Sequence, residues 1–252
     1  MRNRRKIKIN QESFFISKEK INSKYPWNKI EQGWEGHTYK LFDTFLSQSS
    51  SYIDLGAWIG MTVLYGARKA KATYAVEPDP VALEHLRKNI GFNHDIKNKI
   101  HLYEGVVSDS NGMIDLHKKK GRNFGNSAST LLPNARFGYG TGQGDRVLVP
   151  SMTFKTFMKH YDISDCNFIK MDIEGAELMV IPTMKKYLKA YKPTLYLSLH
   201  RRLFKSYEVS KDYNRQNIVD TLKMYSNFYD RHMNRIEWNK ILKYNEIIAT
   251  DD

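Results

Sequence analysis

Two acidic residues and two glycines in one short stretch could hold a ligand that contains adenosine. Asp54 stands two residues before Gly56, and Gly60 follows shortly after. Glu77 then comes at about the spacing at which a carboxylate accepts hydrogen bonds from both ribose hydroxyls. Glycine at these positions would let a ligand approach the backbone, where a Cβ would collide.

The chemistry of Asp54 decides which adenosine ligand the stretch favours. The spacing Gly-x-x-x-Gly differs from the Gly-x-Gly-x-x-Gly of a dinucleotide site, and a carboxylate would repel a pyrophosphate. A carboxylate suits an ammonium group instead. S-adenosylmethionine carries an ammonium and a sulfonium group and no phosphate, so the pattern favours it. A structural turn with no ligand is the alternative.

A second group of side chains could act on an acceptor hydroxyl. Asp172 and Glu174 end a strand expected at Asn167–Ile173, and His200 follows a strand expected at Thr194–Leu199. Because the carboxyl ends of parallel strands meet at one edge of a sheet, we expect the three side chains to lie together. Histidine titrates near neutral pH and could act as the base, with a carboxylate orienting it or acting directly. Alternatively, the three could hold a divalent cation, Mg²⁺ or Mn²⁺, that acidifies the hydroxyl.

The elements that must position these groups alternate between strands and helices. Apolar spacing predicts a strand at Ser51–Leu55, a helix at Met61–Ala70 and a strand at Ala72–Val76, which together form a βαβ unit. A third strand is expected at Ile100–Val107, and Ser108 or Asp109 at its end could contact the adenine. Further segments that we expect to be regular are strands at Met113–Leu116, Arg146–Pro150 and Glu246–Thr250, and helices at His37–Leu46, Pro80–Asn89, Phe154–Tyr161, Ala176–Tyr191 and Asn214–Tyr225. The fold class is therefore α/β, with a doubly wound, mostly parallel, seven-stranded Rossmann-like sheet.

Three blocks of the sequence together resemble the FkbM family of S-adenosylmethionine-dependent methyltransferases. They are Asp54-Leu-Gly-Ala-Trp-Ile-Gly60, Glu77-Pro-Asp-Pro80 and Phe168-Ile-Lys-Met-Asp-Ile-Glu-Gly-Ala-Glu177. The resemblance covers roughly residues 30–200, and the third block is the most specific. It implies S-adenosylmethionine as the methyl donor and a glycan or natural-product hydroxyl as the acceptor. The residues that it places at the cofactor are Asp54, Gly56, Ala57, Trp58, Gly60, Glu77, Pro78 and Asp79.

The chain of 252 residues suits an N-terminal extension at 1–50 and a methyltransferase domain at 51–252. The resemblance implies that the extension caps the cofactor, so Trp27, Trp34 and Glu35 could touch ligand, with buried packing as the alternative. A glycine-rich stretch at 121–144 has no periodicity, and its amide and hydroxyl groups suit a substrate loop; disorder is the alternative.

Composition bears on where in the cell the protein acts and on what it could bind. No apolar run is long enough for a membrane span, and the basic N-terminus lacks the apolar core of a signal peptide. A single cysteine, Cys166, fits a reducing compartment, so we expect a cytoplasmic protein. The net charge of +13 could reflect composition alone or a basic face that binds an anionic partner.

The expected function is O-methylation of a hydroxyl on a sugar, glycan or related small molecule by S-adenosylmethionine. A nucleic-acid methyltransferase and a non-catalytic adenosine-binding protein are the alternatives. Strand Thr194–Leu199 lacks the glutamate of a Lys-Asp-Lys-Glu ribose methyltransferase, and no Asn-Pro-Pro-Tyr block follows Asn167–Ile173. A nucleic-acid partner is therefore disfavoured, and the sequence leaves the exact acceptor and the oligomeric state open.

Overall fold

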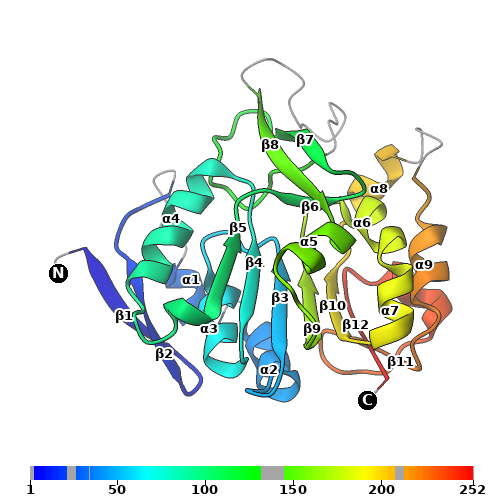
Figure 1. Cartoon of the computed structure of the whole chain (residues 1–252), viewed down its shortest axis with the longest axis horizontal. Helices are drawn as coiled ribbons and strands as arrows, with labels where there is room; N and C mark the ends of the chain where they lie inside the picture. Colours follow the sequence, from blue (N-terminus) through cyan, green and yellow to red (C-terminus); the bar gives the residue numbers. More distant parts are fainter. Residues whose placement is uncertain (1–2, 22–26, 34, 132–144, 208–212, 252) are drawn as a thin grey trace.

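A seven-stranded sheet forms the centre of the computed structural model, which describes residues 3–21, 27–33, 35–131, 145–207 and 213–251. The strands follow the order β11-β12-β10-β9-β3-β4-β5 (Figure 1). They are β3 (Ser51–Leu55), β4 (Thr73–Val76), β5 (Ile100–Tyr103), β9 (Cys166–Met171), β10 (Thr194–Ser198), β11 (Asn227–Asp230) and β12 (Glu246–Thr250). β12 runs antiparallel to both of its neighbours, and the other adjacent pairs are parallel. The predicted mostly parallel, seven-stranded sheet is confirmed.

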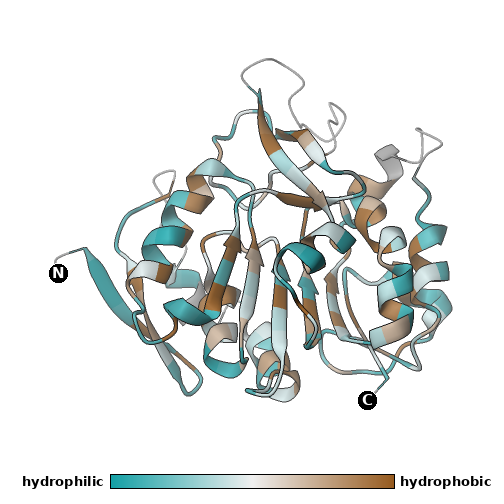
Figure 2. Cartoon of the chain, viewed as in Figure 1, coloured by the Kyte–Doolittle hydropathy of each residue, from teal (hydrophilic) through white to brown (hydrophobic). Residues whose placement is uncertain are grey.

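Alternate residues of the strands enter two separate hydrophobic cores. Tyr52, Phe168 and Tyr196 pack with helices α2 (Gly36–Phe45) and α3 (Met61–Lys69) on one face. Ile53, Ile169 and Leu195, each directly adjacent in sequence to one of those residues, pack on the other face. The helices of that second core are α5 (Phe154–His160), α6 (Glu177–Thr183), α7 (Lys185–Tyr191) and α9 (Gln216–Leu222). Because successive side chains of a strand point to opposite faces, this alternation produces a sheet that is covered on both sides. Hydrophobic and hydrophilic colours also alternate along the surrounding helices in Figure 2, as expected for helices with one buried side.

The strand predicted at Ile100–Val107 is two strands, and this prediction was wrong. β5 ends at Tyr103, and β6 (Val106–Ser108) belongs to a second sheet with the order β6-β8-β7. The other strands of that sheet are β7 (Gly112–His117) and β8 (Arg146–Thr153), which lie above the upper end of the central strands in Figure 1. Gly105 permits the change of sheet, since a Cβ there would lie 2.5 Å from the carbonyl oxygen of Pro150 in β8.

The helix predicted at Ala176–Tyr191 is divided as well. α6 ends at Thr183 and α7 begins at Lys185, with Met184 between them. Pro182 has no N–H to donate to the preceding turn, which weakens the helix at this point. The predicted single helix is therefore two helices.

The described residues among the first 45 pack against the rest of the chain and share one of its hydrophobic cores. Strands β1 (Arg4–Ile9) and β2 (Glu12–Ser17) form a hairpin. The side-chain amides of Asn89 on α4 (Pro80–Gly91) and of Asn93, just after this helix, bond to the backbone of the hairpin. Trp27 opens the short helix α1 (Trp27–Glu31), is 2% exposed and contacts Phe14 edge-on. The extension therefore shares its hydrophobic interior with α2 and α3.

Candidate active site

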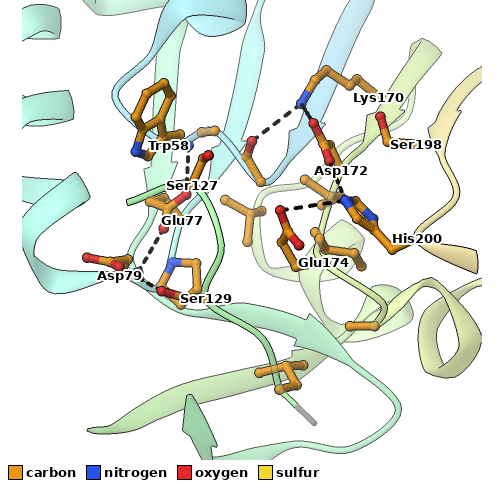
Figure 3. Close-up of a pocket in the computed structure, with 18 of the residues that line it drawn as sticks. Trp58, Glu77, Asp79, Ser127, Ser129, Lys170, Asp172, Glu174, Ser198 and His200 are labelled. Carbon is orange, nitrogen blue, oxygen red and sulfur yellow. Dashed lines mark hydrogen bonds and ion pairs between the residues drawn. The ribbon is translucent and has the colours of Figure 1, made fainter. Parts of the chain in front are cut away.

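A cavity of about 830 Å³ opens at the carboxyl ends of the parallel strands, where open α/β sheets bind their ligands. Figure 3 shows two groups of side chains that face each other across it. Trp58, Glu77, Asp79, Ser127 and Ser129 form one group. Lys170, Asp172, Glu174, Ser198 and His200 form the other.

The two glycines of the first turn are required by the protein backbone itself. Both have φ +92°, in the left-handed region that favours glycine. A Cβ on Gly56 would lie 2.0 Å from the carbonyl oxygen of Asp172, and one on Gly60 would lie 2.6 Å from Leu86. Gly56 thus allows the turn after β3 to touch the end of β9, which brings the two halves of the site together. Both glycines have a structural reason in addition to the close ligand approach that we expected.

Glu77 lies at the end of β4, lines the cavity and is 6% exposed. Its Oε2 accepts the backbone N–H of Trp58 at 2.7 Å, and its Oε1 accepts that of Asp79 at 2.8 Å. Burial and the nearby charge of Asp79 outweigh these hydrogen bonds and raise the pKa of Glu77 to about 8. The ligand-free carboxyl group therefore keeps its proton up to about pH 8, and ribose hydroxyls that donate to its oxygens would favour the ionised form that the predicted contact requires.

Asp79 and Trp58 line the cavity but also hold a loop in place. Asp79 Oδ1 accepts the N–H groups of Val81 and Ala82 at the start of α4. Its Oδ2 accepts from the Gly125 N–H and from the Ser129 hydroxyl. The indole N–H of Trp58, a residue with φ 47°, donates to the Gly125 carbonyl. Both carboxylate oxygens of Asp79 therefore accept hydrogen bonds that hold the protein's own structure together.

The described part of the loop predicted at 121–144 reaches the cavity, and its role in binding a substrate stays a prediction. Asn126, Ser127, Ser129 and Leu131 line the cavity, together with Lys119 just before the loop. The hydroxyl of Thr130 donates to the carbonyl of Glu174 at 2.6 Å, which ties the loop to the opposite group of side chains. The remaining part of the prediction, residues 132–144, lies outside the described residues.

Asp54 is not placed where it could meet a ligand directly. Its side chain is fully buried, is absent from the cavity wall and accepts hydrogen bonds from Thr62 and from Lys170 Nζ, the latter at 3.1 Å. The ammonium group that faces Asp54 is therefore that of Lys170. Burial by itself would lower the pKa of Lys170, but the charges of Asp54 and Asp172 raise it, so the ammonium stays charged. The direct contact predicted between Asp54 and a ligand ammonium is replaced by this ion pair.

The structure does bring Asp172, Glu174 and His200 together, as predicted. His200 Nε2 lies 3.5 Å from Asp172 Oδ1 and 3.6 Å from Glu174 Oε1, while Nδ1 lies 3.1 Å from Oε1 of Glu177. Glu177 is fully buried and also accepts the N–H groups of Ile173 and Gly175, so it fixes the turn that carries Glu174.

Three surrounding carboxylates change the expected chemistry of His200. Burial alone would lower its pKa, but the charge and hydrogen bond of Glu177, followed by the charges of Glu174 and Asp172, raise it to about 10. The imidazole is therefore protonated at neutral pH and is not an available base. This corrects the prediction that His200 titrates in the working range, because the sequence does not show that Glu177 lies against its ring.

The predicted divalent cation is not supported. Within the described part of the chain, no three His, Cys, Asp or Glu side chains are arranged to hold a metal ion.

Ser108 and Asp109 do not reach the cavity wall. The Ser108 hydroxyl is buried against Ser151 within the second sheet, and Asp109 accepts a hydrogen bond from Tyr213. Val106 and Val107 line the cavity in their place. The break of the strand at Gly105 explains the difference, since it moves the following residues into the other sheet.

Several cavity residues were missed or left undecided by sequence reasoning. Glu35, whose φ is 63°, lines the cavity, whereas Trp27 does not and Trp34 lies outside the described residues. Tyr39 and Glu246 also line it. Glu246 accepts from the hydroxyl of Tyr196 and lies 2.6 Å from His37 Nε2. Lys170 could have been found, because a lysine inside an apolar strand is rarely buried without a partner.

The cavity fits S-adenosylmethionine in this structure. Glu77 offers a carboxylate for ribose hydroxyls, and the apolar side chains of Leu55, Val76 and Met61 border the same space. The Tyr39 hydroxyl is buried at the cavity without a hydrogen-bond partner among the described residues, as a site that awaits a polar ligand would leave it. Glu77 and the first turn would hold the adenosine half of the molecule.

The fold is Rossmann-like, and the cavity fits the cofactor of S-adenosylmethionine-dependent methyltransferases. The family model of the methyltransferase FkbM domain matches residues 54–235, which is more than half of the chain. The chain belongs to this FkbM family, as its three sequence blocks indicated.

Solved structures of similar overall shape include three methyltransferases. The methyltransferase FkbM from Methylobacillus flagellatus KT is 17% identical, with 88% of this chain and 52% of that chain covered and a TM-score of 0.49. The O-methyltransferase from Bacillus cereus in complex with SAH is 8% identical, with 86% and 79% covered and a TM-score of 0.43. The tRNA m1G37 methyltransferase of M. jannaschii is 14% identical, with 83% and 48% covered and a TM-score of 0.35. This chain therefore spans about half the length of the Methylobacillus protein. A search of curated proteins finds no significant match.

Proposed function

We propose that this methyltransferase is an O-methyltransferase that acts on a hydroxyl of a sugar, a glycan or a related small molecule. The observation that carries the proposal is the group formed by Asp172, Glu174 and His200, which faces Glu77 across one cavity. Carboxylates beside a cofactor pocket can accept the proton of a hydroxyl group. S-adenosylmethionine supplies the methyl group when it is bound.

Asp172 is the base in this proposal. Its side chain is 39% exposed at the cavity, more than that of Glu174. Oδ1 lies near the imidazolium of His200, and Oδ2 lies 4.0 Å from Lys170 Nζ, so two cations orient the carboxylate. The acceptor hydroxyl gives up its proton to Asp172 as its oxygen is methylated, and His200 stabilises the negative charge around the site. A positioned base of this kind contributes about 10²–10⁴-fold to the rate.

Polar groups of the loop supply the recognition that a saccharide needs. Ser127 and Ser129 line the cavity on the side opposite His200, and Asn126 lines it as well. Amides and hydroxyls can both donate and accept hydrogen bonds, as sugar hydroxyls do. None of the helices in the described part of the chain has the length and apolar character that a membrane crossing needs. The single cysteine supports action in a reducing compartment, and we propose the cytoplasm.

The direct test is transfer of a deuterated methyl group from labelled S-adenosylmethionine to panels of saccharides, nucleotide sugars, RNA and DNA, read by mass spectrometry. We expect label on a saccharide hydroxyl with the wild-type protein. Asp172→Asn should lower turnover by about 10²-fold or more while leaving affinity for the cofactor within about twofold. Asp115→Asn, which removes a carboxylate that is paired with Arg146 outside the cavity, is the matched control. Label in nucleic acid with all saccharides inert would refute the proposal.

A further inference from the structure

Lys170 is an ammonium group built into the cavity wall with part of its donor capacity unused. It lies on β9, is 5% exposed, and its Nζ donates to Asp54 Oδ1 at 3.1 Å and to the Gly56 carbonyl at 3.3 Å. An ammonium group has three protons. The next acceptor, Asp172 Oδ2, lies 4.0 Å away, which is beyond hydrogen-bond distance. One N–H therefore remains for a ligand among the described surroundings of Lys170.

Tyr39 provides a second unused donor in the same cavity. Its side chain comes from α2, is 1% exposed and lines the cavity, and its hydroxyl has no hydrogen-bond partner within the described part of the chain. Asp54 and Glu35 lie close enough for their charges to add to the effect of burial in raising the pKa of Tyr39. The hydroxyl therefore keeps its proton and can donate it. Leaving such a group unpaired in a buried place is unfavourable, and an acceptor on a ligand would remove this cost.

The position of these donors matches one part of the cofactor. β3 lies between β4, which carries Glu77 at its end, and β9, which carries Lys170 and then Asp172. The carbonyl of Gly56, in the first turn, accepts from Lys170 directly. If Glu77 holds the ribose and Asp172 faces the acceptor, then Lys170 lies between them, where the amino-acid half of the cofactor must pass. That half carries a carboxylate, which pairs well with an ammonium and a hydroxyl donor.

We propose that Lys170 and Tyr39 bind the α-carboxylate of the methionine half of S-adenosylmethionine, and that Asp54 is a positioning residue that holds Lys170. This inference rests on the proposed methyl donor. Asp54 then lies behind the cavity wall and holds Lys170, and Lys170 is the group that contacts the cofactor. The Asp54–Lys170 pair also explains how a buried ammonium is tolerated before the ligand arrives.

The test compares two ligands by calorimetry on the full chain. S-adenosylhomocysteine has the amino-acid half, and 5′-methylthioadenosine lacks it but keeps the adenosine and a thioether. We expect Tyr39→Phe to weaken binding of S-adenosylhomocysteine by about 10-fold, and Lys170→Met combined with Asp54→Asn by about 30-fold or more. Binding of methylthioadenosine should change by less than about twofold in both variants, which also shows that the cavity remains folded. Tyr65→Phe, whose hydroxyl bonds to Asp43 away from the cavity, is the matched control and should behave as wild type.

Three outcomes would overturn the inference. Equal weakening of both ligands would show a general loss of the cavity, and unchanged binding of both would show that the two donors do not meet the cofactor. Unchanged binding of S-adenosylhomocysteine with a raised KM for the acceptor would show that Lys170 and Tyr39 bind the acceptor and not the cofactor. The proposed acceptor can fail separately: selective loss of S-adenosylhomocysteine binding with no saccharide methylation supports this subsite and refutes the O-methyltransferase proposal.

Discussion

Replacing Glu77 by glutamine should remove a pH dependence from the stability of the ligand-free protein. Burial and the charge of Asp79 raise the pKa of Glu77 to about 8, whereas the ordinary value is 4.5. Below pH 4.5 the carboxyl is protonated in both the folded and the unfolded chain. Between pH 4.5 and 8 the unfolded chain has released the proton and the folded chain keeps it, so the free energy of unfolding falls as the pH rises.

The size of this effect follows from the size of the pKa shift. One pH unit in this window corresponds to about 1.4 kcal/mol, so the wild-type protein should lose about 4–5 kcal/mol from this group between pH 4.5 and 8. Above pH 8 the contribution is constant. Glu77→Gln cannot titrate, so the variant should start less stable than wild type at pH 5, because its amide can accept from only one of the two N–H groups of Trp58 and Asp79. The difference between the two proteins should then shrink and change sign as the pH rises, because the loss from Glu77 exceeds the cost of one unpaired N–H group, about 1–3 kcal/mol.

Urea-induced unfolding at a series of pH values between 5 and 8 measures the difference profile directly, since groups common to both proteins cancel. Glu237→Gln, at an exposed glutamate, should give a profile parallel to wild type. Saturating S-adenosylhomocysteine should flatten the wild-type slope, because ribose hydroxyls that donate to Glu77 favour its ionised form. Parallel profiles for wild type and Glu77→Gln across the whole range would refute the assignment of a raised pKa to this residue.

Three further predictions concern the other half of the site. Asp54→Asn leaves the buried ammonium of Lys170 without its carboxylate and should lower the free energy of unfolding by about 3–5 kcal/mol. Most of this loss should be recovered when Lys170→Met is added. A loss below about 1 kcal/mol in urea unfolding would contradict the ion pair. Glu177→Gln removes the group that raises the pKa of His200 most. The pH profile of kcat should therefore gain an inflection near pH 6–8 that the wild type lacks. A histidine inflection in the wild-type profile would show that His200 is not permanently protonated. Gly56→Ala places a Cβ 2.0 Å from the Asp172 carbonyl at φ +92° and should lower the stability measured by thermal unfolding by roughly 2–4 kcal/mol. Gly91→Ala, which has open space around its Cβ, should change stability little. Equal stability of the two variants would show that the turn at Gly56 can relax.

The fold class could be predicted from the sequence because its signals are local. Apolar runs marked β3, β4, β9, β10 and β12, and the structure places all five in the central sheet. The convergence of Asp172, Glu174 and His200 followed from one rule, that parallel strands end at the same edge. The failure at Ile100–Val107 has a local cause that periodicity does not show, since only the approach of Pro150 requires Gly105 to turn there.

The sequence by itself determined which residues stand at strand ends, and the tertiary structure decided what each of them can do. Lys170 and Asp54 are far apart along the chain, and they pair because β9 lies beside β3 in a register that sets Asp54 opposite Lys170. His200 is a cation and not a base because α6 brings the buried carboxylate of Glu177 against its ring. Residue types and spacing are read along one chain, whereas charge state depends on the burial and the neighbours that folding creates.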